Sequence, residues 1–444
     1  MPRYSKGFKK ILGRWDSIAI NIGIVIGVGI FRVPAEVAAY LPSSCYILLA
    51  WAIGGLITLL GALCYAELAA AFPQTGGNYV YLRKSYGTWA GFLYGWTEFL
   101  VIRTGSIAAV AFVFAEYLSS LLSTEPFLIK PFAIGIIVIL SVINIVGLRY
   151  GKGIQNVFTI AKITAIVGII LLGVVSGKGD IAHFRPLPVS PDRGLFPLFG
   201  LALIPILWTY GGWHENTFVA GETKNAERII PSALIIATLI ITGLYLAINA
   251  LYIYMIVPRE MADLRLIASS VLQILCGLRG SKIVEALIVV SSIGAINAMI
   301  ITGSRITYAM AKDNALFRIL GEVHPAYGTP LWAIILNAAW ATVLVIFGTF
   351  NMLLFFTGIV VWLVFAFAAA GLFVLRHKYP ALKRPYKIWG YPVVPAIFVI
   401  ICVALSINTL LFYPRQSMIG LCLTLTGVPI FILSRKRKVL LKRR

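Results

Sequence analysis

Residues 23–31 read Gly-Ile-Val-Ile-Gly-Val-Gly-Ile-Phe, and their glycines interrupt the first long apolar stretch of the chain, residues 15–41. In a helix each glycine costs up to about 1 kcal/mol relative to alanine. Inside a bilayer an unwound turn must line a cavity or bind something, because backbone groups without partners are not tolerated against lipid. The stretch therefore predicts a helix that breaks near Gly27–Gly29, with a ligand site at the break.

The composition of the chain is typical of a membrane protein. Its 444 residues are 60% hydrophobic and 12% charged, whereas a soluble domain is about a quarter charged. Apolar runs longer than about 18 residues recur, which predicts a polytopic, all-α membrane protein. The formal net charge of +22 is better explained by lysines and arginines in cytoplasmic loops than by binding of nucleic acid.

Twelve transmembrane helices can be drawn along the sequence. They cover residues 15–41, 44–72, 87–118, 127–148, 155–176, 195–221, 229–257, 282–309, 329–348, 351–375, 391–413 and 416–433. With the N-terminus inside, most lysines and arginines fall in cytoplasmic segments, which places both termini there. The expected order is a cytoplasmic N-terminus (1–14), a first repeat (15–176), a second repeat (195–375), two further helices (391–433) and a basic cytoplasmic tail (434–444).

Two polar stretches are expected to lie outside the bilayer. Residues 73–86 are too polar to span it and predict a cytoplasmic connector lying against the membrane. Residues 258–281 are mixed in character and predict an external segment containing a short helix.

A second interruption lies in the sixth predicted helix. Residues 207–215 read Leu-Trp-Thr-Tyr-Gly-Gly-Trp-His-Glu, so paired glycines and polar groups again break an apolar run. The sixth helix is five helices after the first, and because five is odd the second group of five has inverted topology. Close helix packing explains one glycine-rich stretch equally well. Interrupted helices in matching positions of two halves instead indicate a transporter site near the bilayer midplane.

The two breaks predict what such a site binds. At each break the first half-helix ends in free carbonyls and the second begins with free N–H groups, and the helix dipoles have the same signs. An α-amino acid carries the matching ammonium and carboxylate. The N–H groups of Gly27, Val28 and Gly29 are expected to hold the carboxylate, and carbonyls near Val25 and Trp208 the ammonium. The predicted substrate site comprises Val25, Ile26, Gly27, Val28, Gly29, Trp208 and Gly211.

Several motifs resemble one known family. They are Gly23–Phe31, Trp208–Trp213 with Ala220–Asn225 and Pro231, Ala66–Leu68 with Pro73–Gly77, and Arg384–Pro392. Together they resemble the amino acid–polyamine–organocation superfamily, and most closely its L-type amino acid transporter branch. The resemblance covers nearly the whole chain.

The resemblance implies a fold and an activity, and it raises the question of a heavy-chain partner. The fold would be a five-plus-five inverted repeat with broken helices 1 and 6 and two extra helices. The activity would be amino acid transport by alternating access, commonly as exchange, with Trp208 as an aromatic lid over the substrate. Animal members join a glycoprotein heavy chain through a cysteine in the loop after the third helix. Residues 119–130 contain no cysteine, so no disulfide-linked heavy chain is expected.

Lys162 is the candidate coupling residue. It lies about two turns inside the fifth helix, some ~10 Å by helix rise, where a lysine is costly and usually functional. Snorkelling to the cytoplasmic surface is the alternative. The branch carries a lysine at the matching place, and sodium-dependent relatives bind their ion nearby. Ser291 and Ser292 are the candidate partners, although serines in membrane helices more often have packing roles.

Other polar side chains in the predicted helices are candidates for ion pairs, packing or the gate. Glu98 and Arg103 are five residues apart, a poor spacing for a pair on an α-helix, so separate partners are expected. Arg32 and Glu36 are four apart, and a packed ion pair is favoured over an outer-gate role. His214 and Glu215 follow the second break. If His214 lines the pocket, it is expected to tune side-chain selection or pH response, and a hydrogen-bonded packing role is the alternative.

The sequence thus predicts a secondary active transporter that exchanges neutral amino acids without sodium, in the plasma membrane. The alternatives are a proton-coupled symporter, a polyamine carrier, and a sensor or channel that does not transport. The motifs of enzymes are missing, and neither a cofactor nor a metal site is expected. The expected partners are the amino acid substrate and membrane lipid, without nucleic acid.

Overall fold

The computed structural model describes residues 10, 12–41, 43–74, 76–146, 152–185, 194–264, 266–313, 319–325 and 327–442. Most of the predicted N-terminal segment 1–14, and the side chains of the predicted tail from residue 435 onward, lie outside the described part. In the described part, the regular structure is helical apart from one isolated bridge between Leu12 and Thr223.

The helices follow the predicted apolar segments. The first half of the chain holds α1 (Arg14–Val25), α2 (Val33–Tyr40), α3 (Ser44–Ala71), α4 (Asn78–Tyr86), α5 (Thr88–Thr97), α6 (Thr104–Leu122), α7 (Ile129–Val146) and α8 (Lys152–Ser176). The second half holds α9 (Leu195–Thr209), α10 (Ala226–Met255), α11 (Pro258–Met261), α12 (Ile267–Asp313), α13 (Leu331–Phe347), α14 (Phe350–Lys378), α15 (Val393–Phe412), α16 (Pro414–Leu425) and α17 (Gly427–Lys442). Short 3₁₀ or π segments are η1 (Gly29–Phe31), η2 (Glu98–Arg103), η3 (Pro126–Leu128), η4 (Ile181–Phe184) and η5 (Glu215–Glu222).

Eight helices in the described residues are long and apolar enough to cross a membrane. They are Ser44–Ala71, Thr88–Leu122, Pro126–Val146, Ala226–Met255, Ile267–Tyr308, Phe350–Lys378, Val393–Phe412 and Pro414–Ser434. Shorter apolar helices occupy Lys162–Ser176, Leu195–Thr209 and Leu331–Phe347. The all-helical, multi-pass membrane character is therefore confirmed, while the number of twelve spans and the inverted repeat stay predictions.

The two polar stretches form helices of their own. The predicted connector 73–86 contains α4, which packs against α5 and α14. The predicted external segment 258–281 contains the short helix α11 and the start of α12, which bends at Gly277 (φ 68°, ψ −166°). The last predicted span, 416–433, is divided between α16 and α17.

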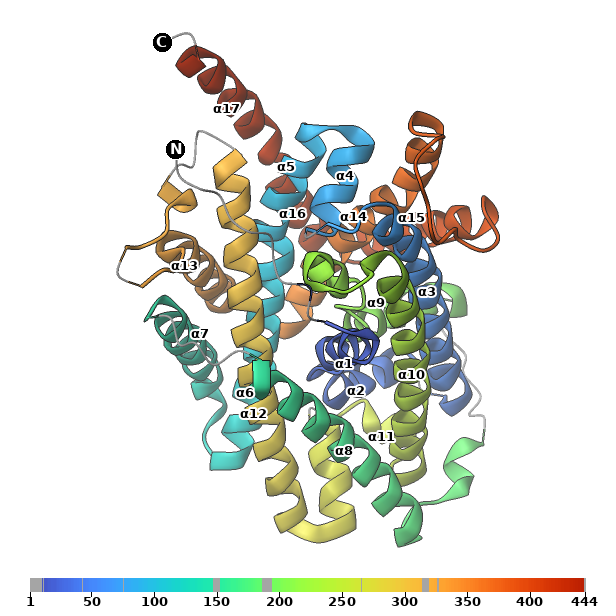
Figure 1. Cartoon of the computed structure of the whole chain (residues 1–444). Coiled ribbons are helices and arrows are strands. Elements are labelled where there is room, and N and C mark those ends of the chain that lie inside the picture. Colours follow the sequence, from blue (N-terminus) through green and yellow to red (C-terminus); the bar gives the residue numbers. More distant parts are fainter. Residues whose placement is uncertain are drawn as a thin grey trace.

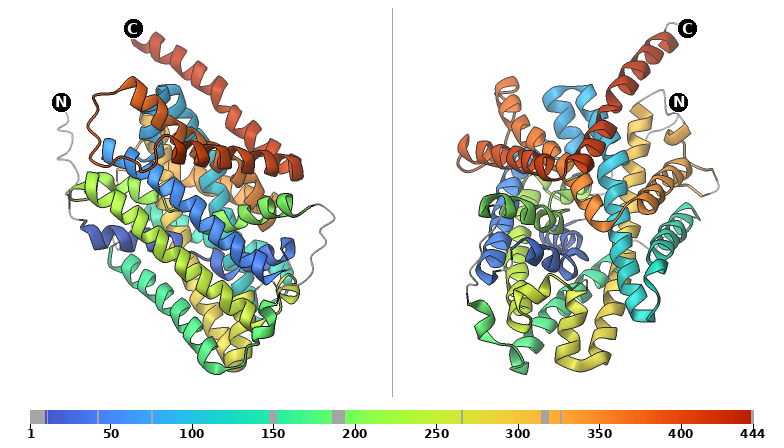
Figure 2. Two further views of the ribbon diagram at one scale, coloured as in Figure 1. Left: turned by 90° about the vertical axis from the view of Figure 1, so that its right-hand side faces the viewer. Right: turned by 180° about the vertical axis from the view of Figure 1, so that it is seen from behind.

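The first two short helices lie in the middle of the bundle. α1 packs against α10 and α8, and α2 packs against α9, so other helices surround the first predicted span (Figure 1). α17 projects from one end of the bundle, as the turned views also show (Figure 2). This arrangement keeps the backbone around residues 26–32 inside the protein, where unpaired polar groups can be tolerated.

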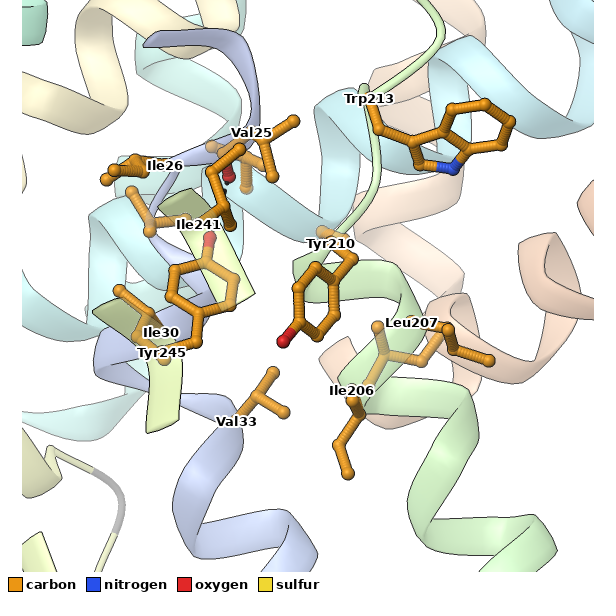
Figure 3. Packing of buried hydrophobic residues seen from close by; sticks show 14 of the residues in the cluster. Val25, Ile26, Ile30, Val33, Ile206, Leu207, Tyr210, Trp213, Ile241 and Tyr245 are labelled. Carbon is orange, nitrogen blue, oxygen red and sulfur yellow. Dashed lines mark hydrogen bonds between the residues drawn. The ribbon is translucent and has the colours of Figure 1, made fainter. Parts of the chain in front are cut away.

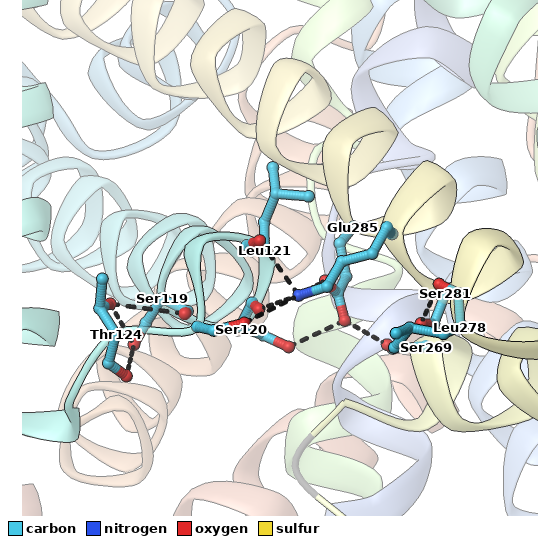
Figure 4. A network of polar contacts seen from close by, with 10 residues as sticks. Ser119, Ser120, Leu121, Thr124, Ser269, Leu278, Ser281 and Glu285 are labelled. Atoms are coloured by element: carbon cyan, nitrogen blue, oxygen red, sulfur yellow. Dashed lines mark hydrogen bonds and ion pairs between the residues drawn. The ribbon is translucent and has the colours of Figure 1, made fainter.

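A polar network joins α12 to the end of α6 (Figure 4). The buried carboxylate of Glu285 accepts hydrogen bonds from Ser120 Oγ (2.8 Å) and Ser269 Oγ (2.5 Å). Lys282 Nζ donates to the carbonyls of Ser120 and Leu121, the latter at 3.0 Å. The Ser120 carbonyl also accepts from the Ser123 N–H at 3.1 Å. The lysine therefore adds hydrogen bonds at the last turn of α6 and links it to α12.

Candidate functional site

The first predicted break is present in the structure. α1 ends at Val25, and the N–H of Gly27 bonds back to the Val25 carbonyl at 2.7 Å. A short 3₁₀ turn, η1, then leads into α2, which has Pro34 in its first turn. Proline suits that place because its missing N–H would have no helical partner there.

The second break follows α9, which ends at Thr209 and contains Pro205. Irregular backbone then leads to η5, and Gly212 has φ +92°, a conformation that other residues rarely adopt. A Cβ atom at Gly212 would also lie 2.6 Å from Cγ2 of Ile24. Glycine is therefore required here by both backbone conformation and space.

The two broken helices lie antiparallel and in contact. α1 contacts η5, and α2 contacts α9, so each half-helix meets the opposite half of the other. A second close approach is at Gly29, where an added Cβ atom would lie 2.9 Å from Thr209 Oγ1 and 3.1 Å from Trp208 Cζ3. Figure 3 shows apolar side chains from both breaks and from α10 packed together.

A cavity of about 150 Å³ lies between the breaks. Of the predicted substrate residues, those that line it are Val25, Gly27, Val28, Gly29, Trp208 and Gly211. Ile26 does not line it, since its side chain is fully buried in the hydrophobic core.

Backbone donors are available at the edge of this cavity. Within η1 the first internal hydrogen bond runs from the Phe31 N–H to the Val28 carbonyl, at 3.1 Å. The N–H groups of Val28, Gly29 and Ile30 precede it and so have no partner within the turn. These groups give the start of the second half-helix its capacity to bind an anion.

The predicted acceptor at the first break is already engaged. The Val25 carbonyl accepts from the Gly27 N–H and from the Tyr245 hydroxyl, which lies 2.9 Å away. The same hydroxyl lies 3.2 Å from the carbonyl of Thr209. Tyr245 of α10 thus joins the two breaks (Figure 3). The sequence analysis missed it, because one hydroxyl in a long apolar helix carries no sign of where it points.

Trp208 separates the cavity from a cluster of charges. Its ring packs edge-on against Phe350, with ring centres 5.6 Å apart, and the Arg32 guanidinium lies 5.0 Å from the centre of the Phe350 ring. Arg32 pairs with Glu36 at 2.7 Å, which confirms that predicted ion pair, and also with Glu116 at 3.0 Å. Phe350 thus connects Trp208, which lines the cavity, to this cluster.

The prediction that Glu98 and Arg103 have separate partners was wrong. Arg103 Nη2 lies 2.8 Å and Nε 3.0 Å from Glu98 Oε1. The reason is η2, a π-helix that spans these two residues, because its i→i+5 hydrogen bonds bring residues five apart onto one face. Arg103 Nη1 also pairs with Glu215 Oε1 at 3.1 Å, so it joins η2 to η5. All three side chains line the cavity.

His214 lies at the cavity wall and packs among aromatic rings, while a role in side-chain selection stays a prediction. It lines the cavity, and its ring also packs among the aromatic rings of Tyr65, Trp213, Phe218 and Phe365. Its Nδ1 atom is buried, and among the described residues it has no hydrogen-bond partner. An unpaired polar atom at a cavity wall is available to a ligand or water.

The predicted coupling residues are not joined to one another. Lys162, Ser291 and Ser292 do not line the cavity. Ser292 Oγ donates to the Ile288 carbonyl at 2.7 Å, and the buried Ser291 Oγ has no partner in the described part of the chain. α8, the helix that carries Lys162, nevertheless packs against both α1, which ends at the first break, and α12, which carries the serines.

Comparison with known proteins supports the same conclusion as the two breaks. A family model described as "Amino acid permease" matches residues 12–433. The serine/threonine exchanger SteT of Bacillus subtilis (strain 168) is 31% identical over 442 residues, which is 99% of this chain and 100% of that protein. The cystine/glutamate transporter of Homo sapiens is 32% identical over 427 residues, 94% of this chain and 83% of its own. The large neutral amino acids transporter small subunit 2 of Oryctolagus cuniculus is 30% identical over 435 residues, 96% of this chain and 80% of its own.

The match spans both breaks, the cavity and the connector, and it agrees with the helical membrane fold. The chain is a transporter and not an enzyme, and it belongs to the amino acid permease family of the amino acid–polyamine–organocation superfamily.

Proposed function

We propose that the chain exchanges small neutral amino acids across the plasma membrane, without sodium, by alternating access in a five-plus-five inverted-repeat fold. The observation that carries this proposal is the meeting of two broken helices at one cavity. The residues that line this cavity include Val28 and Gly29, whose N–H groups begin η1, and Trp208 and Thr209, whose carbonyls end α9. That pairing suits a zwitterion, whose charges are fixed a short distance apart.

The substrate carboxylate would bind the N–H groups of Val28 and Gly29. The ammonium would take carbonyls at the end of α9, including that of Trp208, which has one lone pair left after accepting from the Gly211 N–H at 2.9 Å. For Val25 to take part, the Tyr245 hydroxyl would have to give up its bond to that carbonyl. Substrate binding at the first break would then change the hydrogen bonding of Tyr245 at the Thr209 carbonyl of the second break.

The cavity favours a small, uncharged side chain. Its volume of about 150 Å³ equals that of an engineered cavity that holds benzene, a ligand similar in size to alanine or serine. The Arg103 guanidinium is not available to an acidic side chain, because Glu98 and Glu215 already occupy three of its nitrogens. A relative named as a serine/threonine exchanger agrees with this class of substrate.

Alternating access would use the groups around the cavity. Trp208 would act as the lid, and the Arg32 cluster would hold the outer path closed. Lys162 would supply the positive charge that sodium supplies in other transporters, approaching α1 and the Ser291–Ser292 region in another conformation. Both termini would lie in the cytoplasm, and no disulfide-linked heavy chain would be needed, since residues 119–130 hold no cysteine.

The test is uptake of labelled L-serine into proteoliposomes in sodium-free buffer. Vesicles loaded with unlabelled L-serine should take up label several-fold faster than empty vesicles. Equal uptake into loaded and empty vesicles would rule out exchange, and a requirement for sodium would overturn the proposed role of Lys162.

Proton symport is the second candidate, and one observation favours it. Glu98, Arg103 and Glu215 together carry one net negative charge at the cavity wall, and a proton could neutralise it. An inward proton gradient applied to empty vesicles separates the two functions. Accumulation of L-serine driven by that gradient would replace exchange by symport.

A further inference from the structure

A second hollow, about 420 Å³ in volume, lies away from the substrate cavity, between α4, the start of α5 and the end of α14. We call it the basic groove, and it is lined by Gln74, Tyr79, Val80, Arg83, Lys84, Gly87, Thr88, Lys378 and Tyr379. Three candidate spans end around it: α3 at Ala71, the Thr88–Leu122 span at its first residue, and α14 at Lys378. The groove therefore lies at a membrane surface.

Exposed aromatic side chains lie near the same helix ends as the basic groove. Trp89 is 51% exposed and Tyr379 is 41% exposed, close to the helix ends that frame the groove. Tryptophan and tyrosine gather at the boundary between acyl chains and headgroups. Under the predicted topology this boundary faces the cytoplasm.

The lining is positively charged. It holds Arg83, Lys84 and Lys378, and none of its residues is acidic. Gly87 and Thr88 add the N-terminal end of a helix that continues to Leu122, whose first N–H groups have no helical partners. Each cation also stabilises the C-terminal end of its own helix. That role does not explain why cations from two helices face the same hollow.

The groove is held in shape by tight contacts. Tyr86 Oη donates to the Phe367 carbonyl at 2.9 Å, and an added Cβ at Gly371 would lie 2.5 Å from Ser85 Oγ, so α4 and α14 are closely packed. Gly87 makes the turn from α4 to α5 at φ +103°. The walls are therefore preformed, which lowers the entropy lost when a ligand binds.

We propose that the basic groove binds the phosphate of an anionic phospholipid headgroup. Lys84 and Lys378 approach from two sides, each near an aromatic ring, with Nζ 5.9 Å from the centre of the Phe72 ring and 5.5 Å from that of the Tyr379 ring. Basic pockets between membrane helices at the cytoplasmic surface suit such headgroups. A lipid is favoured over free phosphate, because the groove opens where headgroups are concentrated. This inference rests on membrane embedding and on the predicted topology, and not on the proposed transport cycle.

The test measures the melting temperature of the purified full-length protein in mixed micelles of detergent and phosphatidylcholine, to which phosphatidylglycerol is added in steps. A ligand that binds the folded state raises this temperature as its concentration rises. Wild type should show a saturable rise with phosphatidylglycerol. The double variant Lys84→Gln, Lys378→Gln should bind roughly tenfold or more weakly, with an unchanged melting temperature in phosphatidylcholine alone.

A matched control removes the same charge outside the groove. Lys383 and Lys387 are exposed in the segment between α14 and α15 and do not line the groove. The variant Lys383→Gln, Lys387→Gln should keep the wild-type rise. Equal losses in both double variants, or no loss in the groove variant, would overturn the site. A groove-dependent rise with inorganic phosphate but not with phosphatidylglycerol would overturn the assignment to lipid.

Discussion

Gly29 is the residue at which the two broken helices leave no room for a side chain. Its hydrogen points at Thr209 Oγ1 and at the Trp208 ring, so even a methyl group would push the breaks apart. The sequence analysis selected this glycine for its backbone alone. The structure adds a second reason, because a side chain here would also displace the proposed lid.

Gly29→Ala is therefore expected to reduce exchange by at least about tenfold, since overpacking costs about 1–3 kcal/mol. The measurement is uptake of labelled L-serine per folded, inserted protein. Gly243→Ala is the matched control, because an added Cβ there meets nothing within 4 Å. Equal activity in the two variants would contradict the close approach of the breaks.

Glu215 is the residue that completes the engagement of Arg103. Removing its charge leaves one guanidinium nitrogen facing the cavity without a carboxylate. A hydrogen bond to a charged group contributes about 1.5–3 kcal/mol. Glu215→Gln is therefore expected to make L-glutamate a competitor of L-serine uptake, with affinity roughly tenfold or more above that of wild type.

The control for this prediction is Glu36→Gln, which removes a carboxylate from Arg32 outside the cavity lining. It should leave L-glutamate without effect. If L-glutamate competes equally with wild type and with Glu215→Gln, the carboxylate does not set selectivity. Uniform loss of uptake with no change in competition would assign Glu215 a structural role.

At the scale of elements, the π-helix η2 shows what hydropathy patterns leave undetermined. The positions of the apolar helices and of both breaks could be predicted, because apolar run length and glycine content depend on local sequence. The Glu98–Arg103 pair could not, since its facing depends on one extra residue in a helical turn. A sequence does not reveal such a change of backbone hydrogen bonding. The contacts of Tyr245 could not be predicted for another reason, because the sequence does not show where a single hydroxyl in a long apolar helix points.

One carboxylate, that of Glu67, clamps the segment between α14 and α15 to α3. Glu67 is fully buried and accepts from Arg376 Nε (2.9 Å), Arg376 Nη2 (2.6 Å) and the Ile388 N–H (2.8 Å). Arg384 Nε lies 3.5 Å from it. In the same segment between α14 and α15, burial raises the pKa of Tyr386, so this phenol stays neutral beside Glu67. Two of the motifs that carry the family resemblance thus meet in one ion cluster.

Glu67→Gln is expected to lower the free energy of unfolding by about 3 kcal/mol, because breaking a buried ion pair leaves an uncompensated charge. The melting temperature of the purified variant measures this loss. Glu260→Gln, an exposed carboxylate in α11, should melt like wild type. A Glu67→Gln protein with a wild-type melting temperature would show that the clamp adds no stability.

At the scale of the whole molecule, the proposed lid connects the cavity to the Arg32 cluster. Trp208 lines the cavity and packs on Phe350, and the Arg32 guanidinium lies over the Phe350 ring. A lid that closes over bound substrate affects the rate of the conformational step more than equilibrium affinity. Substitutions of Trp208 should therefore change the rate of transport more than the affinity for the substrate.

Trp208→Ala is expected to lower the maximal exchange rate by about tenfold or more, with a smaller change in the equilibrium dissociation constant of L-serine. Radioligand binding and proteoliposome exchange measured on the same preparation give the two numbers. Loss of binding together with a normal maximal rate would make Trp208 an anchoring residue instead of a lid.

The central claim is that the two helix breaks hold the backbone of an amino acid between them. An electron cryomicroscopy map of the protein with bound L-serine in lipid nanodiscs tests it most directly. The account predicts the carboxylate within hydrogen-bond distance of the N–H groups of Val28 and Gly29, and the ammonium at carbonyls of the breaks. Serine density outside this cavity, or unbroken helices at Gly27–Gly29 and Gly211–Gly212, would contradict it.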